Sequence, residues 1–301
     1  MRTGICTSDF EKSGAAPRSA EHLFSAIHEL GLSCVQFAFS SIAECEFTPS
    51  GQIEIPAFIP SNAIRSVQKY AAQYSLSVEV INGTFNMAHP DGAVRAEGLH
   101  RFAGLTDAAE ELGAKYISLC SGTRNSQHLW TFSPENDTKE AWNDMEDTVK
   151  RAVELAEKKN IILVIESEAS NIIDTPENAR KIMDIVGSEH LKMILDCANL
   201  FHPGQAKPEN VHSVIGHAFE VFGKDIVVAH GKDIRAGDGI DFCGTGLGIV
   251  DFTYTASILR EYGFRGDMFL HGIFDESDMP RAISHWEASA SRKPGPSEAE
   301  P

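Results

Sequence analysis

The chain has 301 residues, 42% of them hydrophobic and 23% charged, which is typical of a globular protein with a sizeable core and excludes general disorder. Its 26 Lys and Arg residues against 43 Asp and Glu residues give a formal net charge of −17. This charge disfavours polyanionic partners, so we expect neither nucleic acid nor a membrane surface to bind.

The sequence also predicts where the protein works. No stretch of about 18 apolar residues occurs, and the N-terminal residues lack the apolar core of a signal peptide. The six cysteines are scattered and form no CxxC pair, which indicates a reducing compartment. We therefore expect a cytoplasmic protein, and the sequence leaves both a monomer and a homo-oligomer open.

Short apolar runs rich in β-formers alternate with segments that have a helical pattern. In chain order, each predicted strand and the helix that follows it are 4–8 and 18–31, 33–39 and 61–75, 76–82 and 93–113, 114–120 and 138–160, 161–167 and 175–187, 191–197 and 208–223, 225–231 and 250–263, and 267–273 and 277–290. The strands are almost continuously apolar, which is typical of parallel strands covered by helices on the outside.

This strict alternation predicts right-handed βαβ units and a parallel sheet. Eight units in a chain of this length favour an α/β fold of one kind, a single (β/α)8 TIM barrel with parallel strands over residues 1–289. An open doubly wound sheet is the structural alternative. The remaining residues, 290–301, are rich in Ser, Pro, Gly and Glu, and we predict a disordered tail there.

The long connections follow the strands, at residues 40–60, 83–92, 122–137 and 231–249. In a barrel, these connections build the face that carries the active site.

Four predicted strands in succession end on a side chain that can bind a metal. Glu166, Asp196, His230 and His271 end the runs IILVIE, LKMILD, DIVVAH and DMFLH. Because neighbouring strands of a barrel converge at their carboxyl ends, we expect these four side chains to meet and bind one divalent metal ion. Mixed oxygen and nitrogen ligands favour Mn, Zn, Co or Fe(II), with Mg less favoured. The alternative is that each residue is only the polar edge of a strand or a helix cap.

Other polar residues follow the strands. Lys232 and Asp233 could contact a substrate or orient His230, or form a salt-bridged loop. Asn86 and His89 follow the third predicted strand and Arg124 the fourth, as candidate substrate contacts; Arg124 could bind a phosphate or carboxylate, with loop packing as the alternative.

The segments VIESE with Glu166, ILDCANLF with Asp196, VVAHGKD with His230, and GTGLGIVDF resemble the xylose isomerase-like barrel superfamily of sugar phosphate isomerases and epimerases. The resemblance covers nearly the whole chain. It implies that Glu166, Asp196 and His230 are metal ligands, that a Glu at the end of the eighth strand is the fourth, and that Asn199 and Arg235 contact the substrate. Arg235 could also bind a phosphate or carboxylate.

At the fourth position the chain departs from that pattern, because His271 stands where the family has Glu. In the family's epimerases, two glutamates act as opposed bases. Here only Glu166 is left, unless His271 or Glu276 substitutes for the second. One base suffices for a proton shuttle between adjacent carbons, so aldose–ketose isomerisation fits better than epimerisation.

These observations predict a metal-dependent isomerase, or epimerase, that acts on a small sugar, sugar phosphate or cyclitol through an enediolate, with Glu166 as the base. Two alternatives stay open. One is a metal nuclease like the apurinic endonucleases, which share the barrel; the other is a catalytically silent sugar-binding barrel.

Overall fold

Eight parallel strands close into a barrel in the computed structural model of the chain, which describes residues 1–10 and 17–292. The barrel strands are β1 (Thr3–Cys6), β2 (Cys34–Phe37), β3 (Ser77–Asn82), β4 (Tyr116–Cys120), β5 (Ile162–Glu166), β6 (Leu191–Asp196), β7 (Ile226–Ile234) and β9 (Met268–Leu270). Each of these strands pairs in parallel with two neighbours, and the pairing of β6 with β7 closes the ring, so the barrel sheet has no open end. The (β/α)8 prediction is confirmed, and the open doubly wound alternative is wrong.

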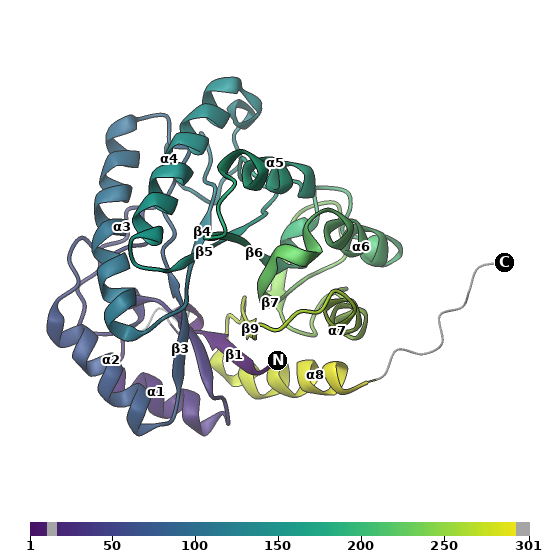
Figure 1. The fold of residues 1–301 in the computed structure, drawn as a ribbon. Helices are drawn as coiled ribbons and strands as arrows, with labels where there is room; N and C mark the ends of the chain where they lie inside the picture. The colour runs from purple at the N-terminus through teal and green to yellow at the C-terminus, as the bar shows by residue number, and fades with distance from the viewer. Residues whose placement is uncertain (11–16, 293–301) are drawn as a thin grey trace.

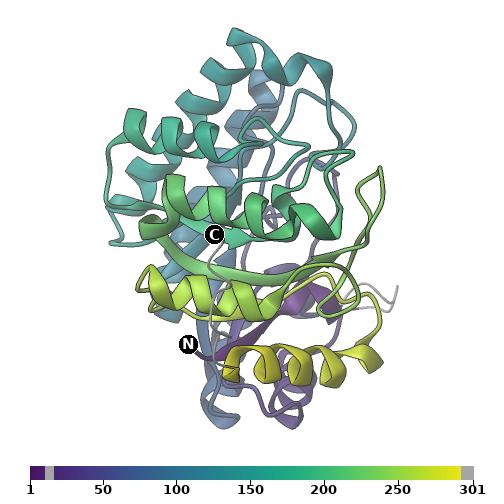
Figure 2. The same cartoon turned by 90° about the vertical axis from the view of Figure 1, so that its right-hand side faces the viewer.

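Eight α-helices in the described residues surround the strands (Figures 1 and 2). They are α1 (Ala20–Glu29), α2 (Ser61–Gln73), α3 (Gly92–Leu112), α4 (Lys139–Glu157), α5 (Pro176–Val186), α6 (Val211–Phe222), α7 (Phe252–Glu261) and α8 (Met279–Ser291). Within the described part of the chain, no helix is both long and apolar enough to span a bilayer. The predicted tail begins inside the end of α8, and its residues 293–301 lie outside the described residues.

Local sequence explains why the helices begin and end where they do, and α5 is an example. Thr175 caps it by accepting a hydrogen bond from the backbone N–H of Asn178, and Pro176 occupies the first turn, where its missing N–H costs nothing. Gly187 ends the helix with a left-handed φ of 61°. The buried face then packs on the sheet through Ala179, Ile182 and Met183.

Side chains fill the inside of the barrel. Each barrel strand contributes one buried residue to an inner cluster made of Cys6, Cys34, Val80, Tyr116, Val164, Ile194, Val228 and Phe269. Gly4 is required beside it, since a Cβ there would lie 2.7 Å from both the Phe269 ring and the Cys34 carbonyl oxygen. This part of the barrel interior is therefore a packed core, and a ligand can enter only at the carboxyl ends of the strands.

The connection after β7 differs from the predicted loop over 231–249. Strand β7 continues to Ile234, and β8 (Phe242–Gly244) pairs with it antiparallel, from Lys232 to Ile234. The polar residues in GKDI interrupt the apolar pattern, so the sequence did not indicate that the strand continues.

Asp233 holds this connection in place. Its fully buried carboxylate accepts hydrogen bonds from four backbone N–H groups: those of Ile234 and Val250 reach Oδ1 at 2.9 Å, and those of Gly246 and Gly248 reach Oδ2 at 3.0 and 2.9 Å. The expectation that Asp233 contacts substrate or orients His230 is thus corrected, because its oxygens are occupied by the backbone leading to α7.

We expect Asp233→Asn to lower the free energy of unfolding by about 1 to 3 kcal/mol, because the amide NH2 would replace an oxygen that accepts two backbone N–H groups. Urea unfolding of the two proteins measures the difference. Asp238→Asn, at an exposed position of the same connection, is the control and should change little. Equal stability of all three proteins would contradict this account of the connection.

Candidate metal centre

Strand register brings the candidate ligands together. Glu166 ends β5, Asp196 ends β6 and His230 lies opposite Asp196 in β7. The pairing of β6 with β7 shifts by one residue between Met193 and Ile194. Without this irregularity, Asp196 would lie opposite Ala229. Since neighbouring side chains of a strand point to opposite faces, the shift is what puts Asp196 and His230 on the same face.

The three side chains form a buried group whose potential ligand atoms all lie within 4.8 Å of one another. His230 Nδ1 is 3.4 Å from Glu166 Oε1 and 3.8 Å from Asp196 Oδ2. Both His230 Nδ1 and Asp196 Oδ2 are buried without a hydrogen bond from the described residues. Buried polar atoms are normally satisfied, and these two lie 3.8 Å apart, so they fit a bound cation in addition to the Lys232 ammonium beside Asp196.

The other ring nitrogen of His230 is held by a residue that the sequence analysis missed. Gln36, in β2, places Oε1 2.9 Å from His230 Nε2. If Nε2 carries the proton and donates it to this carbonyl, Nδ1 keeps its lone pair for a metal. A signal was present, because Gln36 is the one polar residue in the buried strand CVQF.

Lys232 places a buried ammonium group beside this centre. Its Nζ lies 3.3 Å from Asp196 Oδ2 and 4.1 Å from the centre of the Phe242 ring. Burial lowers the pKa of Lys232, but the Asp196 and Glu166 carboxylates outweigh this effect and raise it, so the amine stays charged. Burial alone would raise the pKa of Asp196, but Lys232 and then His230 hold that pKa well below its usual range.

Asn199 orients Glu166. It lies in a short 3-10 helix, Ala198–Leu200, whose first N–H groups are capped by Asp196 Oδ1. From there, Asn199 Nδ2 donates a 2.6 Å hydrogen bond to Glu166 Oε1. The strand end therefore supplies a candidate ligand, and the turn after it supplies a side chain that fixes a second one.

The structure does not bring His271 into the three-residue group found among the described residues. Its Nδ1 lies 3.2 Å from Asp9 Oδ1, and its ring is 5.5 Å from the His230 ring. Asp9 is itself fixed, because its Oδ2 accepts the backbone N–H of Ile273. Glu276 is not at the centre either, since Arg18 binds both of its carboxylate oxygens.

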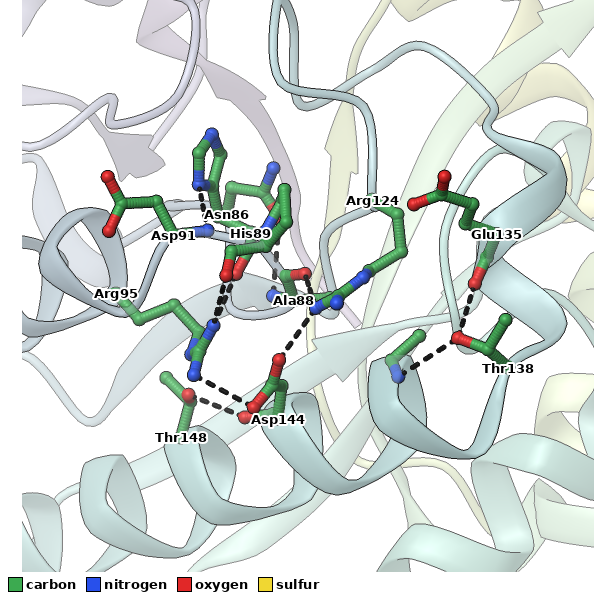
Figure 3. Close-up of polar contacts among 12 residues, drawn as sticks. Asn86, Ala88, His89, Asp91, Arg95, Arg124, Glu135, Thr138, Asp144 and Thr148 are labelled. Carbon is green, nitrogen blue, oxygen red and sulfur yellow. Dashed lines mark hydrogen bonds and ion pairs between the residues drawn. The ribbon is translucent and has the colours of Figure 1, made fainter.

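Four predicted substrate contacts lie outside the cavity lining described below. Arg124 donates to Asp144 Oδ2 at 2.6 Å, and Figure 3 shows Arg95 reaching the same carboxylate. Asn86 bonds to Gln52, and His89 accepts the backbone N–H of Asp91.

The fourth, Arg235, is half-exposed and pairs with Asp241 at 3.1 Å. The ion pair of Arg124 matches its loop-packing alternative, and Arg235 is likewise paired with a neighbouring side chain.

A cavity of about 630 Å³ opens above Glu166, Asp196 and His230, which we call the metal group because these residues could hold an ion. Glu166, Asn199, His230, Lys232 and His271 line it, as do five polar residues that the sequence analysis did not single out, namely Gln36, Glu54, Asn82, Ser118 and Glu168. Most of these five lie in strands or directly after them, so an isolated polar residue at a strand end was the signal available.

Comparison with known proteins agrees with this architecture. A sequence model of the family described as "Xylose isomerase-like TIM barrel" matches residues 24–292. No curated protein sequence matches the chain.

Three solved structures are similar in fold. A D-tagatose 3-epimerase-like protein has a TM-score of 0.72 at 16% identity, over 96% of this chain and 97% of the other. D-psicose 3-epimerase from Clostridium cellulolyticum H10, solved with D-tagatose, has a TM-score of 0.71 at 14% identity, over 96% and 99%. The IolI protein, solved with zinc, has a TM-score of 0.67 at 16% identity, over 96% of each chain.

Metal affinity should rise with pH. Burial lowers the pKa of His230, but the nearby Asp196 and Glu166 carboxylates raise it above its usual value, to about 9. Below that pH, a metal ion must displace one proton from the ring, so the affinity for Mn²⁺ should increase about tenfold per pH unit from pH 6.5 to 8.5. Calorimetric titration in two buffers measures the proton released. Binding at pH 7 without proton release would contradict this expectation.

Two variants test which residues hold the ion. Asp196→Asn should lose the single divalent ion that we expect per chain, because it removes a ligand charge, whereas His271→Ala should retain it. Elemental analysis of dialysed protein measures both. Loss of the metal in His271→Ala would instead place the imidazole among the ligands.

Proposed function

The chain belongs to the xylose isomerase-like TIM barrel family, and from this premise we propose that it is a metal-dependent isomerase or epimerase acting on a small sugar, sugar phosphate or cyclitol. The observation that carries the proposal is the buried Glu166, Asp196 and His230 group at the base of a cavity large enough for such a substrate. The sugar epimerases among the similar structures support the substrate class.

We propose that these three residues hold one divalent ion, with His230 binding through Nδ1. Two carboxylates and an imidazole suit Zn, Mn or Co, and the zinc bound in the similar IolI protein supports this choice. Such an ion would polarise a substrate carbonyl and stabilise negative charge on its oxygen.

Glu166 is the proposed base. Asn199 holds Oε1, so the carboxylate keeps one orientation while it takes a proton from the carbon next to the substrate carbonyl. The substrate then passes through an enediolate, and return of the proton to the former carbonyl carbon, with transfer of the hydroxyl proton to the former carbonyl oxygen, completes an isomerisation. Lys232 supplies a fixed positive charge at the cavity wall that would favour the oxyanion.

Epimerisation needs a second proton donor on the opposite face of the substrate. His271 lines the cavity, and Asp9 fixes its ring in one orientation. We therefore propose the one-base isomerisation as the main reaction, with His271 as the group that an epimerisation would use.

Deuterium exchange tests the reaction. Metal-loaded protein in D2O should introduce deuterium beside the carbonyl of at least one member of a panel of aldoses, ketoses and their phosphates. Glu166→Gln should slow this exchange by about 10² to 10⁴-fold, since it removes the base. Metal content is measured in parallel to separate loss of the base from loss of the ion.

Glu189→Gln is the matched control, because this carboxylate is exposed and distant from the cavity lining. Absence of exchange with every sugar would overturn the proposal. Cleavage of DNA at abasic sites would then favour the nuclease, and sugar binding without exchange would favour a silent binding barrel.

A further inference from the structure

Aromatic side chains line the same cavity as the metal group. They come from four different connections after barrel strands and are Phe47, Trp130, Phe242 and Phe274. Trp130 and Phe274 are 37% and 60% exposed, although side chains of this size are usually buried. Exposed aromatic rings gathered at a cavity mouth are typical of a surface that a ligand covers.

A chain of five hydrogen bonds runs along the cavity wall from this aromatic mouth to the metal group. Trp130 Nε1 donates to Glu54 at 2.8 Å, and Asn82 donates to the same carboxylate at 3.2 Å. Ser118 donates to Asn82 at 3.3 Å.

Gln36 continues the chain by donating to Ser118 at 3.4 Å and placing Oε1 2.9 Å from His230 Nε2. All of these residues line the cavity. One wall therefore offers hydrogen-bonding groups over its whole length, while the mouth offers aromatic faces.

This combination suits sugar rings, which present C–H groups on their faces and hydroxyl groups at their edges. The volume suits more than one ring. A hexose fills roughly 200 Å³, the space of six or seven waters at about 30 Å³ each, against about 630 Å³ for the cavity.

The charges in the lining disfavour a phosphate as the additional group. Among the described lining residues there is no arginine, and the single lysine, Lys232, is paired with Asp196. Glu54 and Glu168, which are not among the proposed metal ligands, add negative charge to the same walls. A neutral extension of the substrate avoids repulsion that a phosphate would meet.

We infer that the cavity binds a disaccharide, with the reacting sugar beside Glu166 and a second sugar ring stacked on Trp130. The inference rests on the proposed function. Because the reacting sugar must keep its carbonyl free for proton abstraction at the neighbouring carbon, the second ring is joined through a hydroxyl away from that carbonyl, as in a reducing disaccharide.

Binding of matched one-ring and two-ring sugars tests this inference. Calorimetry on the metal-loaded protein compares glucose with maltose and fructose with maltulose. We expect each disaccharide to bind at least tenfold more tightly than its single ring. Trp130→Ala should abolish this gain, whereas Trp130→Phe should retain most of it.

Phe132→Ala is the matched control, since Phe132 is 54% exposed in the same connection but lies outside the cavity lining. Equal affinity for one and two rings, or a gain that survives in Trp130→Ala, would overturn the inference. The affinity of 4-nitrophenyl glucoside is measured as well. If only this compound binds more tightly than glucose, the inference is also overturned, because the site beside Trp130 would then prefer an aromatic group to a second sugar ring.

These titrations and the deuterium exchange experiment together separate the two proposals. Single rings that bind and exchange deuterium, without a disaccharide gain, would overturn only the second-ring site. Failure of every sugar to bind would overturn both.

Discussion

The candidate centre depends on one constraint of the sheet, the register between β6 and β7. Closure of the barrel brings the strand ends to a common mouth, but closure alone does not decide which side chains point inward. The irregularity after Met193 decides this for Asp196, because it puts this residue opposite His230. Glu166, Lys232 and Asn199 then take positions relative to this pair, as does the cavity above them. A slip of one residue would turn Asp196 away from the mouth.

The fold and three candidate ligands could be predicted from the sequence because both follow from simple patterns. Strands buried on two faces are apolar throughout, so a Glu, Asp or His at the end of such a run stands out. The rest depends on contacts between distant segments. Nothing near His271 in sequence shows that Asp9, at the other end of the chain, lies beside its ring. Likewise, the role of Gln36 follows only from its contact with His230, and strand β8 is recognised only from its pairing with β7.

The centre also concentrates charge where charge is expensive. Asp196 and His230 are almost fully buried, and Lys232 is 8% exposed. Moving such groups out of water costs several kcal/mol each, in order of magnitude, unless partners compensate. Here each charged group faces an opposite charge, and Asn199 and Gln36 satisfy further atoms. Rigid strands hold most of these groups, so their relative positions are fixed.

The aromatic residues at the mouth are arranged differently, because each belongs to a separate connection between a strand and a helix. Such connections tolerate changes in length and sequence far better than the strands do. Substitutions in these connections can therefore change the lining of the cavity one loop at a time, while the residues on the strands stay unchanged. For protein engineers, a library confined to Phe47, Trp130 and Phe274 would vary the cavity at little risk to the barrel's register.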